Sequence, residues 1–143
     1  MPSIRHSIGI EANPKKIYPL ISTGSGFSKW WAQDVRNEPN ETLDLGFFKR
    51  TTVYKLRLKR ASEPLKAEWH CLSGGEWKGT KLLFHLNKNE DQTVLQFSHA
   101  NWKAKTEYFV SCNTTWGELM FRLKSAAENK ARGPLFSKNG WNP

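Results

Sequence analysis

The sequence has 143 residues, of which 38% are hydrophobic and 24% charged, which suits one folded core and argues against a disordered chain. No apolar run approaches the roughly 18 residues of a membrane span, no signal-peptide core is visible, and two cysteines exclude a disulfide scaffold. We therefore expect a cytoplasmic protein with no membrane partner. A net charge of +9 favours acidic partners, and the seven tryptophans favour a wide cavity, a lid or an interface.

The first 31 residues predict one strand and two short helices. Residues 3–11 alternate between apolar and polar positions, as a half-buried strand does. Asn13-Pro14 is typical of a helix start, with Asn as the N-cap. Residues 23–26 are interpreted as a break, and residues 27–31 as a second short helix that ends in a Trp pair.

The middle of the chain predicts only strands. Turn signals rich in Gly, Pro, Ser or Asn separate several runs of alternating hydrophobicity. Strands joined by turns this short pair antiparallel, and such a sheet can keep one face apolar and the other wet. The runs are residues 43–47, 52–59, 67–71, 81–86 and 94–99.

Residues 105–132 predict one long helix. Apolar residues recur there at steps of three and four, which places them on one stripe of an α-helix. The stripe consists of Tyr108, Cys112, Trp116, Leu119, Leu123 and Ala127. Gly133-Pro134 is a stop signal, and residues 134–143 are expected to form a loosely docked tail.

This order predicts an α+β fold in a single domain spanning residues 1–143. The long helix must bury its stripe on the apolar face of a curved antiparallel sheet of about six or seven strands. The space between helix and sheet is then either a filled core or a cavity.

Several local motifs carry a resemblance to a known family. They are the strand Ile8 to Ala12 followed by Asn13-Pro14, the segment Phe27 to Trp31, Trp69, the segment His99 to Trp102, and the segment Trp116 to Leu119. Together they resemble the START-like superfamily, also called SRPBCC or Bet v 1-like, in the branch named after the activator of the heat-shock-protein-90 ATPase. The resemblance implies a helix-grip fold. It departs at residues 40–49, where a Gly-Gly turn is expected and only Gly46 is found, which leaves the register of the third strand open.

The resemblance also implies a cavity for a hydrophobic small molecule. The inward phases of the strands and the long helix supply aromatic side chains for such a cavity, although a filled aromatic core would use the same positions. We expect the ligand-binding residues to be Trp31 at the entrance, Tyr54, Trp69, Phe84, Phe97, His99, Asn113, Trp116 and Met120. Gly117, in the middle of the helix, favours a close approach of the helix to the sheet.

Polar groups on inward phases are few. His6, His99 and Asn113 could orient a ligand, and each could equally be a hydrogen-bonded residue of the core. No catalytic residue is assigned, because no carboxylate is phased to pair with either histidine. No metal-ligand spacing or phosphate loop is present, so no metal or cofactor is expected.

A basic run covers residues 49–60 and contains six cations and no acid. Such a run could hold phosphates, but it is more often the solvated face of a sheet. Sheets that read RNA also expose aromatic side chains, whereas Tyr54 on this strand points inward. We expect no specific nucleic-acid partner.

Three functional hypotheses follow. The first is non-catalytic binding of a hydrophobic or aromatic small molecule between the sheet and the long helix. The other two come from the resemblance: a co-chaperone-like module that binds a heat-shock ATPase, and an enzyme of the polyketide cyclase or aromatase type. The last would need His6, Tyr54, His99 and Asn113 deep in one cavity.

Overall fold

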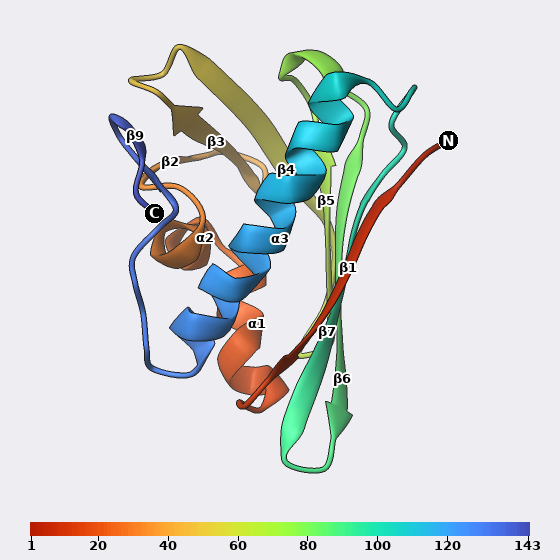
Figure 1. The fold of residues 1–143 in the computed structure, drawn as a ribbon, viewed down its shortest axis with the longest axis vertical. Coiled ribbons are helices and arrows are strands. Elements are labelled where there is room, and N and C mark those ends of the chain that lie inside the picture. The colour runs from red at the N-terminus through yellow and green to blue at the C-terminus, as the bar shows by residue number, and fades with distance from the viewer.

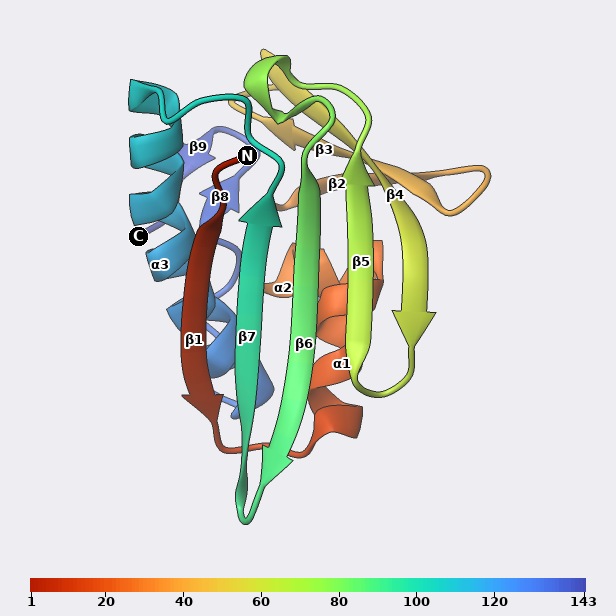
Figure 2. The same ribbon diagram turned by 90° about the vertical axis from the view of Figure 1, so that its right-hand side faces the viewer.

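The computed structural model describes residues 1–143 as one antiparallel sheet with helices on a single face (Figure 1). The sheet order is β1-β7-β6-β5-β4-β3-β2, so the first and second strands lie at opposite edges. The strands are β1 (Ile4–Ile10), β2 (Asp34–Glu38), β3 (Thr42–Phe47), β4 (Thr52–Ser62), β5 (Lys66–Cys71), β6 (Lys81–Asn89) and β7 (Gln92–Ala100). Figure 2 shows the sheet from its outer face, with α1 and α2 behind it and α3 along the β1 edge.

Three helices cover the inner face. They are α1 (Pro14–Ser22), α2 (Gly24–Trp30) and α3 (Glu107–Ala127), and a short 3₁₀ turn η1 (Gly75–Trp77) precedes β6. This arrangement confirms the predicted helix-grip fold. Asn13 caps α1 as predicted, because its side-chain oxygen accepts a hydrogen bond from the backbone N–H of Lys16 at 3.0 Å.

The expected break at residues 23–26 is confined to Thr23, because α1 ends at Ser22 and α2 begins at Gly24. Thr23 is the N-cap of α2, and its hydroxyl accepts from the backbone N–H of Gly26 at 2.8 Å. Gly26 is required there because a Cβ would lie 2.0 Å from the carbonyl oxygen of Pro19 in α1. The glycines that indicate a break in the sequence therefore allow two helices to cross closely.

The third strand has a defined register despite the missing Gly-Gly turn. In β3, Leu45 pairs with Tyr54 on one side and with Val35 of the unpredicted strand β2 on the other. Asn40 and Glu41 adopt positive φ values of 62° and 56°, so they make the turn that glycines were expected to make.

The long helix is continuous but shorter than predicted, ending at Ala127 rather than 132. Its N-cap is Thr106, whose hydroxyl accepts from the N–H of Phe109 at 3.2 Å. The predicted stripe is buried from Cys112 to Ala127, while Tyr108 at its start is 37% exposed. No helix is long and apolar enough to cross a lipid bilayer.

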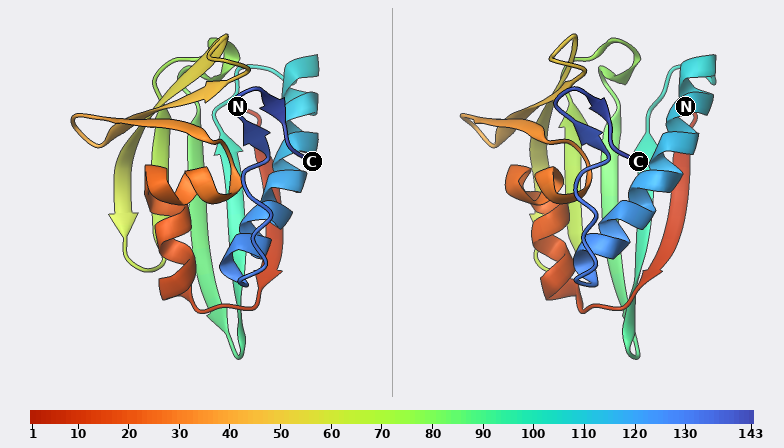
Figure 3. Two further views of the ribbon diagram at one scale, coloured as in Figure 1. Left: turned by 90° about the vertical axis from the view of Figure 1, so that its left-hand side faces the viewer. Right: turned by 60° about the vertical axis from the view of Figure 1, so that its left-hand side comes forward.

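Part of the C-terminal tail packs against the domain, with Leu135, Phe136 and Gly140 buried and residues 141–143 exposed. The tail runs back beside α3 and forms the hairpin β8 (Phe136–Ser137) and β9 (Gly140–Trp141) (Figure 3). Leu135 is fully buried, and its N–H donates to the carbonyl of Trp30 at 3.1 Å. Leu135 and Phe136 are apolar residues that the hydrophobic effect keeps buried, and a ten-residue tail without periodicity does not reveal this.

The tail is also held by a buried cation, Arg122 of α3, which is 2% exposed. Its guanidinium donates to backbone carbonyls of Gly133, at 2.9 Å, and of Asn142. Burial lowers the pKa of this guanidinium, and no carboxylate forms a salt bridge with it. The hydrogen bonds from the charged guanidinium to these carbonyls replace the hydrogen bonds to water that Arg122 loses on burial. The side chain therefore anchors the tail.

Candidate functional site

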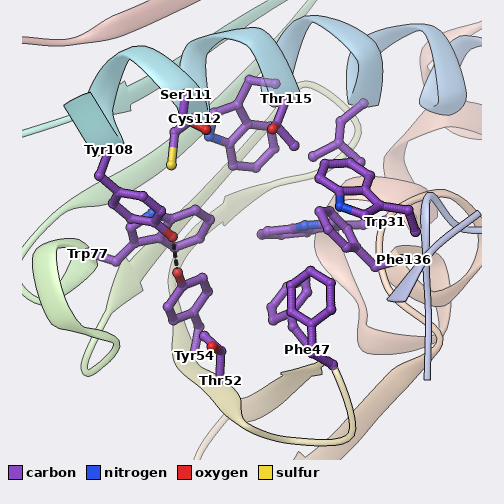
Figure 4. A pocket seen from close by; sticks show the side chains of 14 residues that line it. Trp31, Phe47, Thr52, Tyr54, Trp77, Tyr108, Ser111, Cys112, Thr115 and Phe136 are labelled. Atoms are coloured by element: carbon purple, nitrogen blue, oxygen red, sulfur yellow. Dashed lines mark hydrogen bonds between the residues drawn. The ribbon is translucent and has the colours of Figure 1, made fainter. Parts of the chain in front are cut away.

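A pocket of about 230 Å³ opens between the first half of α3, the β3–β4 turn, η1 and the C-terminal tail. Figure 4 shows side chains from these elements converging on it. Eleven of its 14 lining residues are hydrophobic. They are Trp31, Phe47, Phe48, Thr52, Tyr54, Trp77, Tyr108, Ser111, Cys112, Thr115, Trp116, Leu119, Phe136 and Trp141. The expected cavity between sheet and helix is therefore present.

Exposed aromatic residues form the rim of the pocket. Phe48 is 40% exposed, Tyr108 37% and Trp141 53%, and each comes from a different element. Phe136 of the tail packs edge-on against Phe47 with ring centroids 5.0 Å apart. The tail therefore builds one wall of the pocket.

The opposite wall is a stack of rings. Tyr54 and Trp77 lie 4.2 Å apart between centroids and 19° from parallel, and Trp77 lies parallel to Trp116 at 6.0 Å. Trp31 closes the inner end, 5.0 Å from Trp116. These rings pack on one another, so the wall is already formed in the protein without a ligand.

The polar groups of the pocket are hydroxyls, one thiol and the indole N–H groups of its tryptophans, of which the Trp77 N–H is buried with no hydrogen-bond partner. The hydroxyls of Tyr54 and Tyr108 form a hydrogen bond with each other, drawn as the dashed line in Figure 4. Burial raises the pKa of both phenols and of the Cys112 thiol, so all three keep their protons at neutral pH. Cys71 lies elsewhere in the core, where burial raises its pKa to about 12.

His99 lies behind the ring wall and supports it through hydrogen bonds. The Trp116 indole donates to Nδ1 of His99 at 3.1 Å, and Nε2 lies 2.8 Å from the Thr80 hydroxyl, which is 2.5 Å from the carbonyl of Trp77. Since an indole only donates, Nδ1 is the acceptor, and a neutral His99 donates from Nε2 to Thr80. Burial lowers the pKa of His99 to about 3. The histidine thus fixes Trp77 and Trp116 and has no free nitrogen for a ligand.

The structure brings together only part of the predicted site. Tyr54 and Trp116 line the pocket as expected, whereas Trp31 lines its inner end and not the expected entrance. Trp69, Phe84, Phe97, His99 and Met120 are at most 2% exposed and lie outside it, in the packed core. Trp69 donates its indole N–H to the carbonyl of Ile21 at 2.8 Å, and Phe97 packs on the outer side of Trp116 at 4.3 Å.

Two polar residues lie elsewhere than expected. Asn113 is exposed on α3, so its predicted inward orientation is wrong, because one helical step separates it from buried Cys112. His6 lies under α3 against Gly117, where a Cβ on the glycine would sit 3.5 Å from the histidine Cε1. Of the four residues on which the cyclase hypothesis rested, only Tyr54 lines the pocket.

Trp77 is a lining residue that the sequence reasoning missed. It lies on η1, directly after the turn signal Ser73-Gly74-Gly75, where no periodic pattern exists. Gly74 has φ 114°, and a Cβ there would lie 2.0 Å from the Tyr54 ring, so the glycine lets the turn approach that ring. A large ring beside a glycine-rich turn was the available signal.

The basic run does not form one exposed stripe. Arg50 of the β3–β4 turn pairs with Asp34 of β2 at 2.7 Å, and Lys55 of β4 pairs with Asp44 of the neighbouring β3 at 2.9 Å. The β4–β5 register shifts between Leu58 and Arg60, so Lys59 falls at an irregularity of the strand. The absence of a specific nucleic-acid partner stays a prediction.

Comparison with known proteins identifies the family. No family model matches the sequence, and no curated protein matches it significantly. The solved structure of the Aha1 dimer from Colwellia psychrerythraea is 30% identical, with a TM-score of 0.80 over 91% of this chain and 98% of that one. The chain belongs to the Aha1-like branch of the START-like, or SRPBCC, superfamily.

More distant structures share the fold alone. CalU16 from Micromonospora echinospora is 14% identical with a TM-score of 0.74, over 92% of this chain and 68% of that one. BH1534 from Bacillus halodurans is 19% identical with a TM-score of 0.70, over 90% and 98%.

Proposed function

We propose that this protein binds a hydrophobic or aromatic small molecule, without catalysis, in the pocket between α3, the β3–β4 turn and the tail. The observation that carries the proposal is the pocket itself, with about 230 Å³ of space and 11 hydrophobic residues among 14. An open apolar space of this kind is unfavourable in a folded core, because its walls lose packing contacts. A ligand would restore those contacts and remove the exposed rings of the rim from water.

Native mass spectrometry of freshly purified protein tests the proposal by detecting a co-purified molecule. The matched variants are Thr115→Phe, which fills the pocket, and Thr114→Phe, which adds the same ring to the exposed side of α3. We expect the bound mass to disappear in Thr115→Phe and to persist in Thr114→Phe. The same pattern should hold for an added apolar probe such as 2-acetylnaphthalene. A probe that binds both variants equally contradicts the proposal.

The second candidate function is a co-chaperone-like interaction with a heat-shock ATPase. It is favoured by the 30% identity with a protein named Aha1 over most of both chains. The test is the ATPase rate of a purified heat-shock protein 90 with and without this protein. Stimulation that persists in Thr115→Phe would place that activity on the outer surface, independent of the pocket.

A further inference from the structure

The pocket contains a hydrogen-bonding group with unused capacity, the pair of hydroxyls on Tyr54 and Tyr108. Each phenol has one hydrogen to donate, and the bond between them uses one of the two. Neither hydroxyl has another nitrogen or oxygen partner, and the neighbouring Cys112 thiol is only a weak acceptor. The pair therefore has one hydrogen left to donate.

The position of the pair suits a bound molecule. Both tyrosines line the pocket, on the side across from Trp31 and Phe136 (Figure 4). Tyr54 is 8% exposed and is held by its stack on Trp77, so its ring is already fixed. A donor held in advance costs little ordering entropy when a ligand arrives.

The pocket contains no charge to compensate an ionic ligand. None of its 14 lining residues is Asp, Glu, Lys, Arg or His. An ion moved from water into such a space loses its hydration without gaining a partner. The Glu76 carboxylate, near Tyr54 and Cys112, adds repulsion against an anion.

The volume and the flat walls limit the shape. A cavity of about 150 Å³ binds benzene, so the roughly 230 Å³ here suits a molecule of about two fused rings. Aromatic rings line most of the pocket, and because rings pack well on one another face-on or edge-on, this lining favours a planar aromatic molecule.

Building on the proposed function, we infer that the ligand is an uncharged, planar molecule of about two rings, with one acceptor oxygen bound by the Tyr54–Tyr108 pair. The hydroxyl pair is then the specificity element of the pocket, and the ring wall supplies most of the apolar contact. A carboxylate of the same size and shape is rejected.

Three probes of nearly equal shape test this inference: 2-acetylnaphthalene with an acceptor oxygen, 2-isopropenylnaphthalene without one, and 2-naphthoate with a charge. Equilibrium dialysis gives Kd for the unmodified protein and for the double variant Tyr54→Phe/Tyr108→Phe. A moderate salt concentration screens surface attraction of the anion to the net charge of +9.

We expect the preference for the ketone over the hydrocarbon to fall about five-fold in the double variant, the effect of one neutral hydrogen bond. Naphthoate should bind the unmodified protein at least about 100-fold more weakly than the ketone. An unchanged preference, or naphthoate binding as tightly as the ketone, overturns this inference and leaves the proposed function standing. If none of the three probes binds, both fail together.

Binding of the hydrocarbon reports whether the double variant keeps its pocket. If the variant does not fold, the infrared carbonyl frequency of the ketone bound to the unmodified protein decides. A frequency below that in a hydrocarbon solvent supports the hydrogen bond, and an unshifted frequency overturns it.

Discussion

The two ends of the space beneath α3 contain the same kinds of side chain in different packing. At the packed end, defined by Phe27, Trp30, Trp69, Phe84 and Phe97, every ring is at most 2% exposed and touches other rings. At the pocket, Trp31 and Trp116 are equally buried from solvent, but together with Tyr54 they border a space of about 230 Å³. Aromatic composition is therefore no guide to a cavity here; the neighbouring elements decide. Helices α1 and α2 fill one end, whereas a turn and a tail only surround the other.

The largest expected effect comes from replacing one tryptophan by alanine at each end. Trp69→Ala should destabilise the protein by about 3–5 kcal/mol, as for other buried Trp residues. Trp141→Ala, at a residue 53% exposed, should cost less than about 1 kcal/mol. Urea unfolding measures both.

Ligand affinity should respond in the opposite order. Because Trp69 lies outside the pocket, the milder Trp69→Phe should leave the affinity for 2-acetylnaphthalene unchanged, whereas Trp141→Ala should weaken it. Weaker binding in Trp69→Phe than in Trp141→Ala would show that the two ends are coupled.

The next largest effect is a pH dependence at the boundary between the ends, where His99 supports Trp116. The pKa of His99 is about 3 in the folded state, against about 6.5 unfolded, so the unfolded chain binds more protons between these values. The contribution of His99 to the free energy of unfolding is therefore fully present above about pH 6.5 and is lost as the pH falls. The expected loss is about 2–3 kcal/mol over the two pH units below that value. Urea unfolding from pH 7.5 to 4.5 measures the slope.

Two variants isolate this slope. His99→Gln should be less stable at pH 7.5 and should lose much of the pH dependence. His85→Gln, a half-buried histidine on β6 outside this network, should retain it. Equal slopes in the two variants would mean that other groups cause the acid sensitivity.

A smaller effect concerns the tail that closes the pocket. Arg122→Met removes the guanidinium from the carbonyls of Gly133 and Asn142 and should cost about 1–2 kcal/mol. The control Arg132→Met removes an equal charge from an exposed side chain. Hydrogen exchange at Leu135 and Phe136 should become faster in Arg122→Met only. Unchanged exchange there would show that apolar contacts alone hold the tail.

The smallest effect has the opposite sign. Gly117→Ala should stabilise the protein by about 0.5–1 kcal/mol, since alanine favours a helix more than glycine does. The new Cβ would sit 3.5 Å from the His6 Cε1, an ordinary contact. Thermal unfolding measures it. A lower Tm would mean that the close approach inferred from the sequence does require glycine.

Most of the fold was predictable because periodicity reports which face of an element is buried. The strands from β4 to β7, the continuous helix and the cap at Asn13 all follow from local pattern. Strand β2 was missed because its residues are half-buried or exposed at a sheet edge, so it has no apolar face. The burial of Leu135 and Phe136 in the tail was not predicted, because these residues contact parts of the chain that are distant in sequence.

An aromatic pocket was predictable from the sequence, but which of the inward-facing residues line it was not. Phase along a strand shows that Trp69 and Tyr54 both point inward, but not that α2 covers the first and leaves the second free. Trp77, Phe136 and Trp141 lie on a turn and a hairpin, where side-chain direction depends on tertiary packing. The inward orientation predicted for Asn113 was wrong because a shift of one residue along a helix turns a side chain by about 100°.

The tail also determines when the pocket is completed during synthesis of the chain. Backbone hydrogen bonds join Trp30 to Leu135 and Trp31 to Phe136, so two stretches about a hundred residues apart meet at one wall of the pocket. A ribosome delivers the N-terminal stretch first, and contacts this distant in sequence form late. While the chain is still being translated, the ring wall therefore has no facing wall. The pocket is complete only after Trp141 has been synthesised, so the small molecule of the proposed function can be enclosed only by a finished chain.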